Sequence, residues 1–301
     1  MMHTKFPKPT MTATATATGT PGPIPTIIPT PTEWQVLGDA GHRTLWVVFA
    51  LMLVTSGVFA VLSWNVPVSK RIYHVLSTLM AIIATISYFA LASGDGEAYN
   101  CVTVRDAHKH TPDMYHEVCR QVYWVRYVDW ALTTPLLLLQ LSLLAGIDGA
   151  HTLMAVVANV IMILTAMFSA FGTEGTAQTW GWYAISCISY MFVIWHVALH
   201  GTRVVGNKGA GVSRLFGSLG LFTFLVWTAY PIVWGIVNGS HKPSIDTEIM
   251  IYAVLDFLAK PVFGAWLLFS HRAMQETNID MTGWWSHGLA AEGRIRIGDE
   301  E

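Results

Sequence analysis

The chain has 301 residues, of which 53% are hydrophobic and only 12% are charged, and it contains 13 tryptophans. A soluble domain usually carries about 25% charged residues, so this balance argues against a soluble protein and for a membrane protein. The formal net charge of −2 provides no basic surface for nucleic acid, and we expect no nucleic-acid partner.

The chain divides into a tail, a membrane domain and a second tail. Residues 1–34 are rich in Thr, Pro and Ala with little periodic apolar surface, so a disordered tail is expected. Residues 35–272 contain seven apolar runs, each with the ~20 residues that a helix needs to cross the hydrocarbon core. The runs begin at Thr44, Tyr73, Val122, Thr152, Trp180, Arg214 and Glu248. The predicted fold is therefore all-α, a bundle of seven transmembrane helices, followed by a polar tail over residues 273–301.

Loop charges orient the bundle only weakly. With the N-terminus outside, eight Lys and Arg residues lie on the inner side and seven on the outer side. The positive-inside rule therefore slightly favours an extracellular N-terminus and a cytoplasmic C-terminal tail. We expect a multi-pass integral protein, most naturally of the plasma membrane.

The third apolar run carries charges at membrane depth. Its stretch RYVDWALTTPLLLLQ places Arg126, Asp129, Thr133 and Gln140 on one helix face, because eleven residues are close to three helical turns. Gln140 then lies ~16 Å along the axis from Asp129. Charges at this depth usually face the bundle interior or a water-filled cavity, so this face is expected to point inward.

The seventh run carries a second set of charges. Asp256 and Lys260 are four residues apart and share a helix face, and Glu248 lies at the mouth of the run. One interpretation is a structural ion-pair network, but burying several ionic groups rarely adds much stability. Ionisable groups at this depth more often mark a functional site. A lysine held by carboxylates suits either a proton-coupled transporter or a Schiff base with a carbonyl cofactor.

The sixth run adds an aromatic stripe. Trp227, Tyr230 and Trp234 recur at helical spacing beside Pro231, and Trp130 adjoins the aspartate of the third run. Such a stripe is more often core packing than a cofactor site. Beside a buried lysine, however, it also suits the walls around a long conjugated apolar ligand.

Three motifs carry a family resemblance. RYVDWALTTPLLLL, WTAYPIVW and LDFLAK resemble the third, sixth and seventh helices of microbial (type I) rhodopsins, particularly fungal opsins related to bacteriorhodopsin and the Leptosphaeria-type rhodopsin. The likeness extends over roughly residues 35 to 300. It implies all-trans retinal bound as a covalent protonated Schiff base on Lys260, an extracellular N-terminus and a light-driven cycle rather than an enzymatic one. The implied partners are the lipid bilayer, protons and internal water.

The resemblance also implies roles for individual residues. Asp129 resembles the primary counterion and proton acceptor, Asp256 the second counterion, and Arg126 the gate toward the proton exit. Thr133 is expected to hydrogen-bond Asp129 and to tune the pKa of its carboxyl group. The residues expected to line the retinal are Tyr127, Trp130, Thr134, Leu137, Met162, Tyr183, Ser186, Trp227, Tyr230 and Trp234.

Several positions depart from the family pattern. Gln140 stands where pumping members have a carboxylic acid that returns a proton, and an amide cannot donate one at physiological pH. Asn159 replaces an aspartate, most simply as a hydrogen-bonding exchange without functional change. Glu248 matches one carboxylate of a proton-release pair, with Asp246 as a poor substitute for its partner. Pro261 removes a backbone N–H beside the lysine and disfavours a regular helix there.

Two functions fit this pattern. One is an outward light-driven proton pump, slowed because Gln140 cannot return the proton. The other is a sensory photoreceptor in which a long-lived deprotonated state signals and little net transport occurs. The acceptor Asp129 favours the pump, and the missing donor favours a slow cycle. The sequence leaves homo-oligomerisation and any signalling partner open.

The cysteines and histidines give weaker signals. Cys101 and Cys119 fall in one predicted loop and are either bonded to each other or free thiols. His196 and His200 are four residues apart on the fifth run, but no third ligand accompanies them in the sequence. We therefore expect no metal site.

Overall fold

The structure of the chain, a computed structural model, describes residues 31–67, 71–106, 114–173, 175–239, 243–274 and 277. Most of the two predicted tails, 1–34 and 273–301, lies outside these residues. Within the predicted N-terminal tail, Glu33 and Trp34 belong to a β-strand, so the ordered part of the chain begins before residue 35.

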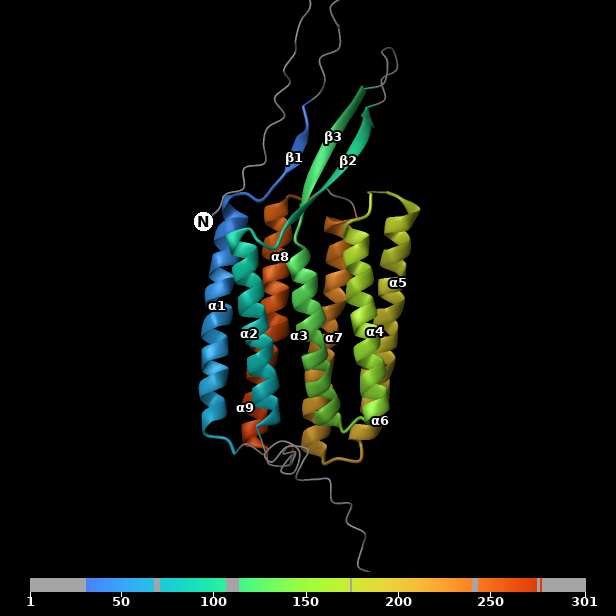
Figure 1. Cartoon of the computed structure of the whole chain (residues 1–301). Coiled ribbons are helices and arrows are strands. Elements are labelled where there is room, and N and C mark those ends of the chain that lie inside the picture. Colours follow the sequence, from blue (N-terminus) through green and yellow to red (C-terminus); the bar gives the residue numbers. More distant parts are fainter. Residues whose placement is uncertain are drawn as a thin grey trace, which may run out of the picture.

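Seven helices in the described part of the chain are long and apolar enough to cross a membrane, which confirms the seven predicted spans. They stand side by side in one bundle, each antiparallel to the next along the chain (Figure 1). Two of the spans contain a short π-helical segment between two α-helices. The spans are α1 (Asp39–Trp64), α2 (Ile72–Ser93), α3 (Trp124–Ala145), α4 (Gly149–Ala170), α5 (Ala177–Ile194) with η2 (Trp195–Leu199) and α6 (His200–Val205), α7 (Ala210–Val237), and α8 (Ile245–Phe257) with η3 (Leu258–Val262) and α9 (Phe263–Ala273).

Local sequence signals fix several helix ends. Asp148, Thr176 and Ser244 cap the first turns of α4, α5 and α8, each accepting a backbone N–H with its side-chain oxygen. Gly94 and Gly146 end α2 and α3 with φ of 83° and 78°, a left-handed conformation that glycine adopts without steric cost. At Gly146 the end is followed by a short turn into α4, whereas at Gly94 the chain leaves α2 for the segment before α3.

The backbone at Lys260 departs from a regular α-helix. Residues Leu258–Val262 form the π-helical segment η3, with Pro261 inside it. Because proline has no N–H and crowds the preceding turn, the regular hydrogen-bond pattern cannot continue through it. The irregular helix predicted at the lysine is therefore confirmed.

A small sheet covers one end of the bundle. Strands β2 (Ala98–Asp106) and β3 (Met114–Val122) form an antiparallel hairpin between α2 and α3, and β1 (Glu33–Gln35) pairs parallel to β3. The strand order is β1-β3-β2, and the sheet projects beyond the helices (Figure 1). The sequence predicted a loop here. The strand signal is short, and its β-branched residues lie between two long apolar runs that dominate the hydropathy pattern.

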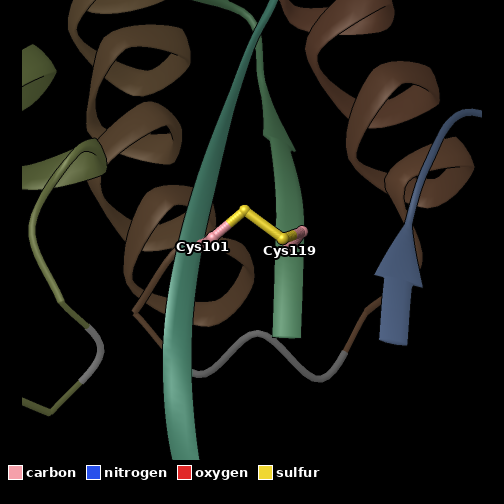
Figure 2. Close-up of a disulfide and its surroundings, with 2 residues drawn as sticks. All are labelled: Cys101 and Cys119. Carbon is pink, nitrogen blue, oxygen red and sulfur yellow. A yellow bond between two sulfur atoms is a disulfide. The ribbon is translucent and has the colours of Figure 1, made fainter. Parts of the chain in front are cut away.

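A disulfide joins the two strands of the hairpin. Cys101 of β2 and Cys119 of β3 lie opposite each other in the register, and their sulfur atoms are bonded (Figure 2). The structure therefore resolves the two alternatives left by the sequence in favour of the bonded pair. Cys187 is free and lies in α5.

Apolar side chains lie on the outside of the bundle as well as in its core. Val61 of α1 is 69% exposed, Leu225 of α7 65% and Ile86 of α2 64%. A soluble monomer rarely exposes apolar surface this extensively. The exposed apolar faces are those that contact lipid in a membrane-spanning bundle, while the polar groups described below are buried inside it.

Candidate functional site

Lys260 lies inside the bundle between two carboxylates. Its side chain is 3% exposed, and its ammonium forms ion pairs with Asp129 of α3 and, at 3.6 Å, with Asp256 of α8. An unpaired ammonium at this depth would cost much free energy, because apolar surroundings do not solvate its positive charge. The two aspartates compensate that charge. The sequence placed these three residues together, and the structure brings them into direct contact.

Asp256 is held by three further hydrogen bonds. The Tyr88 hydroxyl donates to Oδ2 at 2.7 Å, and the Tyr230 hydroxyl and the Trp130 indole N–H donate to Oδ1 at 2.7 and 3.0 Å. All three partners are donors, which suits an ionised carboxylate because that group only accepts hydrogen bonds. The Asp256 side chain is therefore fixed in place by α2, α3 and α7.

Asp129 has a sparser environment. Its Oδ2 accepts from Lys260, whereas its Oδ1 makes no hydrogen bond within the described part of the chain. The prediction that Thr133 binds the Asp129 side chain is wrong, because the Thr133 hydroxyl donates to the Asp129 backbone carbonyl at 2.8 Å. Threonine in a helix readily reaches the carbonyl four residues earlier. One carboxylate oxygen of Asp129 is thus left to take a proton.

A pocket with mostly apolar and aromatic walls opens beside Lys260. Tyr183 stacks on Trp234 with ring centroids 4.9 Å apart, and Trp130 meets Tyr230 edge to face at 5.0 Å. The lining includes nine residues predicted for this role: Trp130, Thr134, Leu137, Met162, Tyr183, Ser186, Trp227, Tyr230 and Trp234.

Tyr127 is the exception among the predicted lining residues. It does not line the pocket but lies behind Trp234, whose indole N–H donates to the Tyr127 hydroxyl at 3.1 Å. Trp130, three residues later on α3, lines the pocket, whereas Tyr127 is linked to the lining through this hydrogen bond with Trp234. Its contact with the pocket is therefore indirect.

The pocket and the lysine together suit one class of cofactor. Pockets for small molecules are mostly apolar with a few placed polar groups, and here the polar groups include the Lys260 amine and its aspartate partner Asp256. An amine can condense with an aldehyde, and the aromatic walls can enclose an extended apolar chain. These residues fit an apolar conjugated aldehyde such as retinal.

A second ionic cluster lies toward the sheet. Glu248 of α8 forms ion pairs with Arg126 at 2.7 Å and with Arg120 of β3 at 3.0 Å. The Arg126 guanidinium also lies 4.4 Å from the centre of the Tyr252 ring, which lines the pocket. Asp246 is no partner of Glu248 here: its carboxylate accepts the Gly38 backbone N–H at 2.7 Å.

Gln140 is buried on the other side of the lysine, toward the end of the bundle opposite the sheet. The Ser77 hydroxyl of α2 donates to its Oε1 at 3.0 Å, and its Nε2 has no hydrogen-bond partner among the described residues. Asn159 of α4 donates to the Thr134 hydroxyl at 2.6 Å. Both amides therefore link neighbouring helices through side-chain hydroxyls, and neither carries a transferable proton at neutral pH.

Three residues around the site were not predicted. Tyr88 and Tyr252 lie in apolar runs where a tyrosine looks like core packing. No spacing ties Tyr88 to the aspartates, whereas Tyr252 lies four residues before Asp256 on one helix, a signal that could have found it. Arg120 precedes the third span in the segment taken for a loop. Its ion pair with Glu248 of α8 gives it a place in the site.

The prediction that His196 and His200 lack a third ligand is wrong. His151 of α4 lies with its Nδ1 2.7 Å from His196 Nδ1, and the Asp148 carboxylate is 3.4 Å from His200 Nε2. The sequence could not indicate this, because the two sets of residues are about 45 positions apart and meet only when α4 packs on α5.

Comparisons with known proteins agree with this architecture. Residues 40–274 match the family model of Bacteriorhodopsin-like proteins. Opsin-1 of Neurospora crassa is 67% identical over 278 residues, which are 92% of this chain and 91% of that protein. The opsin-like protein carO of Fusarium fujikuroi is 33% identical over 80% of this chain and 76% of its own length.

Solved structures show the same helical bundle. The crystal structure of the light-driven proton pump LR (Mac) from Leptosphaeria maculans is 53% identical, with a TM-score of 0.79. The match covers 82% of this chain and 100% of that one. The light-driven proton pump rhodopsin of Coccomyxa subellipsoidea is 34% identical with a TM-score of 0.70, covering 79% of this chain and all of its own.

Proposed function

This chain belongs to the bacteriorhodopsin-like family, and we propose that it is a light-driven outward proton pump whose proton return is slow. The observation that carries the proposal is the Lys260 amine, buried between Asp129 and Asp256 beside an aromatic pocket. Two relatives of known structure, from Leptosphaeria maculans and Coccomyxa subellipsoidea, are described as light-driven proton pumps, which supports the same activity here.

The proposed cofactor is all-trans retinal, bound covalently to Lys260 as a protonated Schiff base. When bound, it supplies a light-driven change of shape that displaces the Lys260 nitrogen and its proton. The pocket residues hold the rest of the ligand between aromatic walls and exclude water from it. Asp129 and Asp256 balance the positive charge on the nitrogen in the dark.

Asp129 is the proposed proton acceptor. It contacts the Lys260 nitrogen directly and keeps one carboxylate oxygen without a partner among the described residues. Asp256 is farther from that nitrogen, at 3.6 Å, and three donors already occupy its oxygens. A proton leaving Lys260 therefore has its shortest path and its freest acceptor at Asp129.

The exit route is proposed to run through Arg126 and Glu248 toward the sheet. Movement of the Arg126 guanidinium, which lies between Glu248 and the Tyr252 ring, would change the electric field at Asp129.

The orientation in the membrane is inferred from the hairpin, whose strands β2 and β3 carry the Cys101–Cys119 disulfide and lie on the same side as this exit route. Disulfides persist in oxidising compartments, which supports an extracellular sheet, an extracellular N-terminus and outward transport across the plasma membrane.

The return route has no carboxylic acid at its expected place. Gln140 is fully buried and, among the described residues, its side chain is hydrogen-bonded only to Ser77, so we infer that the Lys260 nitrogen regains its proton from water entering the other half of the bundle. The same feature favours the second candidate function, a photoreceptor in which the long-lived deprotonated state is the signal. Both functions share the slow step and differ in whether protons cross the membrane in steady light.

The slow step is tested by time-resolved absorbance of the wild type and of Gln140→Asp over a pH series. In the wild type, decay of the deprotonated state should slow as pH rises, because the proton comes from solvent, and azide should accelerate it. In Gln140→Asp, decay should be at least about tenfold faster at pH 8, within the range that a positioned general acid contributes, and less dependent on pH. A wild-type decay that is fast and independent of pH would mean that another residue donates.

A further inference from the structure

Three histidines and an aspartate meet near the end of the bundle opposite the sheet. Asp148 caps α4, His151 lies in its first turn, His196 lies in η2 and His200 begins α6. Carboxylate and imidazole atoms of Asp148, His151 and His200 all lie within 4.8 Å of one another. His196 joins them through the 2.7 Å contact between its Nδ1 and that of His151. We refer to these four residues as the histidine cluster.

The rings of His151 and His196 are placed to share one centre between their Nδ1 atoms, while the His200 ring stacks on His151 with ring centroids 3.7 Å apart. Two Nδ1 atoms 2.7 Å apart can share one proton, since one ring must donate and the other accept. Zinc binds imidazole nitrogen at about 2.0–2.1 Å, which separates two nitrogens by about 3.3 Å in tetrahedral geometry. A shift of about 0.6 Å would therefore let a metal ion replace that proton, and rotation of the stacked His200 ring would bring in a third nitrogen.

The two oxygens of the Asp148 carboxylate have different partners. Its Oδ1 accepts the His151 backbone N–H at 3.0 Å and caps the helix, while its Oδ2 faces His200. The cap fixes the carboxylate on the same side as the rings without using its second oxygen.

Access from solvent is open at this cluster. The side chains of Asp148 and His200 are 55% and 26% exposed, in contrast to the buried charges of the lysine site. Another group with metal-ligand atoms in the described part of the chain, Cys101, Glu117 and Cys119, has its two thiols joined in the disulfide. The histidine cluster is thus the better candidate for an ion from solution.

We propose that the histidine cluster binds one divalent transition-metal ion of the zinc class, with imidazole nitrogens of His151, His196 and His200 and the Asp148 carboxylate as ligands. Three nitrogens and one carboxylate oxygen are a ligand set that zinc accepts with tetrahedral geometry. The bound ion links α4 to the η2 and α6 segments of the fifth span. It also stabilises the folded chain, by an amount that grows with the logarithm of the free metal concentration above the dissociation constant, because the four ligands come together only when these helices pack.

The test is zinc binding to the purified full-length chain in detergent, produced without a histidine tag. Equilibrium dialysis against buffered zinc, followed by metal analysis, should give close to one tightly bound ion per chain. Zinc-edge X-ray absorption should show nitrogen and oxygen neighbours and no sulfur. His151→Ala and His196→Ala should each weaken binding more than tenfold, and zinc should raise the melting temperature of the wild type but not of these variants.

His42→Ala is the matched control, because His42 is an exposed histidine of α1 outside the cluster. It should bind zinc like the wild type. His200→Gln provides a second cluster variant if an alanine variant fails to fold, as judged by the visible absorbance of the retinal-loaded protein. Absence of saturable binding in the wild type, equal losses in His42→Ala and the cluster variants, or sulfur neighbours of the bound zinc would overturn the proposal.

Discussion

At the scale of single residues, the two aspartates beside Lys260 differ in the hydrogen bonds they receive. Asp256 accepts from Tyr88, Trp130 and Tyr230, whereas Asp129 accepts from Lys260 at one oxygen and has no hydrogen-bond partner for the other among the described residues. This asymmetry supports different roles for two groups of the same chemistry. Asp129 is the group able to change its protonation, and Asp256 is the fixed counter-charge.

The role of Asp129 can be tested by Asp129→Asn. Removing the negative charge nearest the Lys260 nitrogen should destabilise the ground state of the bound chromophore relative to its excited state and move the absorption to longer wavelength. Rapid formation of the deprotonated state should also be lost, because its acceptor is gone. Static and flash absorbance spectra measure both effects. If the absorption maximum does not move, Asp256 is the dominant counterion, and the proposed roles of the two aspartates are reversed.

The Glu248 cluster gives a prediction about stability. Glu248→Gln leaves the buried guanidinium groups of Arg126 and Arg120 without their carboxylate, which should cost about 3–5 kcal/mol of unfolding free energy. The control is Asp246→Asn, the same chemical change two residues earlier, where the carboxylate accepts only the Gly38 backbone N–H in the described contacts. That variant should lose less than about 1 kcal/mol, since an amide can still accept the bond. Denaturant unfolding measures both, and equal losses would contradict the account.

The sequence predicted the charged residues of the site better than their partners. Lys260, Asp129 and Asp256 could be found because charges are rare in apolar runs and helical spacing groups them. Tyr88 and Arg120 could not, because their contacts cross between elements far apart in the chain. Thr133 was placed correctly but given the wrong partner, since spacing along a helix does not distinguish a side-chain acceptor from a backbone carbonyl.

At the scale of elements, the seven spans followed from length and apolarity, while the sheet did not. Hydropathy runs of about 20 residues identify membrane helices strongly, but a short hairpin depends on pairing that a single sequence does not display. Pro261 did indicate the irregular backbone at Lys260, because its missing N–H has a local effect. The π-helical segment η2 contains no proline, and no comparable local signal marks it in the sequence.

The hairpin gives the prediction at this scale. The double variant Cys101→Ser, Cys119→Ser should lose about 2–4 kcal/mol of unfolding free energy, because the disulfide restricts the unfolded chain. The visible spectrum of the loaded protein should be unchanged, since the hairpin lies outside the pocket. Thermal unfolding with and without reductant measures the effect: reductant should lower the melting temperature of the wild type but not of the double variant. The double variant is the control for the effect of reductant, and an equal drop of its melting temperature in reductant would contradict the prediction.

At the scale of the whole molecule, the polar groups are arranged along one path through an apolar bundle. Glu248 and Arg126 lie toward the sheet, Lys260 with its aspartates lies in the interior, and Gln140 lies toward the opposite end. The half on the sheet side contains charges that can exchange protons, whereas the amide on the other side cannot donate one. This asymmetry predicts rapid release on the sheet side and slow uptake from the opposite side.

Vectorial transport is the central claim, and the direct measurement is the extracellular pH of illuminated cells that carry the protein in the plasma membrane. The wild type should acidify the medium steadily in the light, and a protonophore should abolish the change. Gln140→Asp should acidify faster, and Lys260→Ala, without the attachment site, should give no response. If the wild-type protein completes its light cycle, as followed by absorbance, but the medium shows no sustained acidification, the pump is contradicted and the photoreceptor is supported. Alkalinisation of the medium would contradict the proposed orientation.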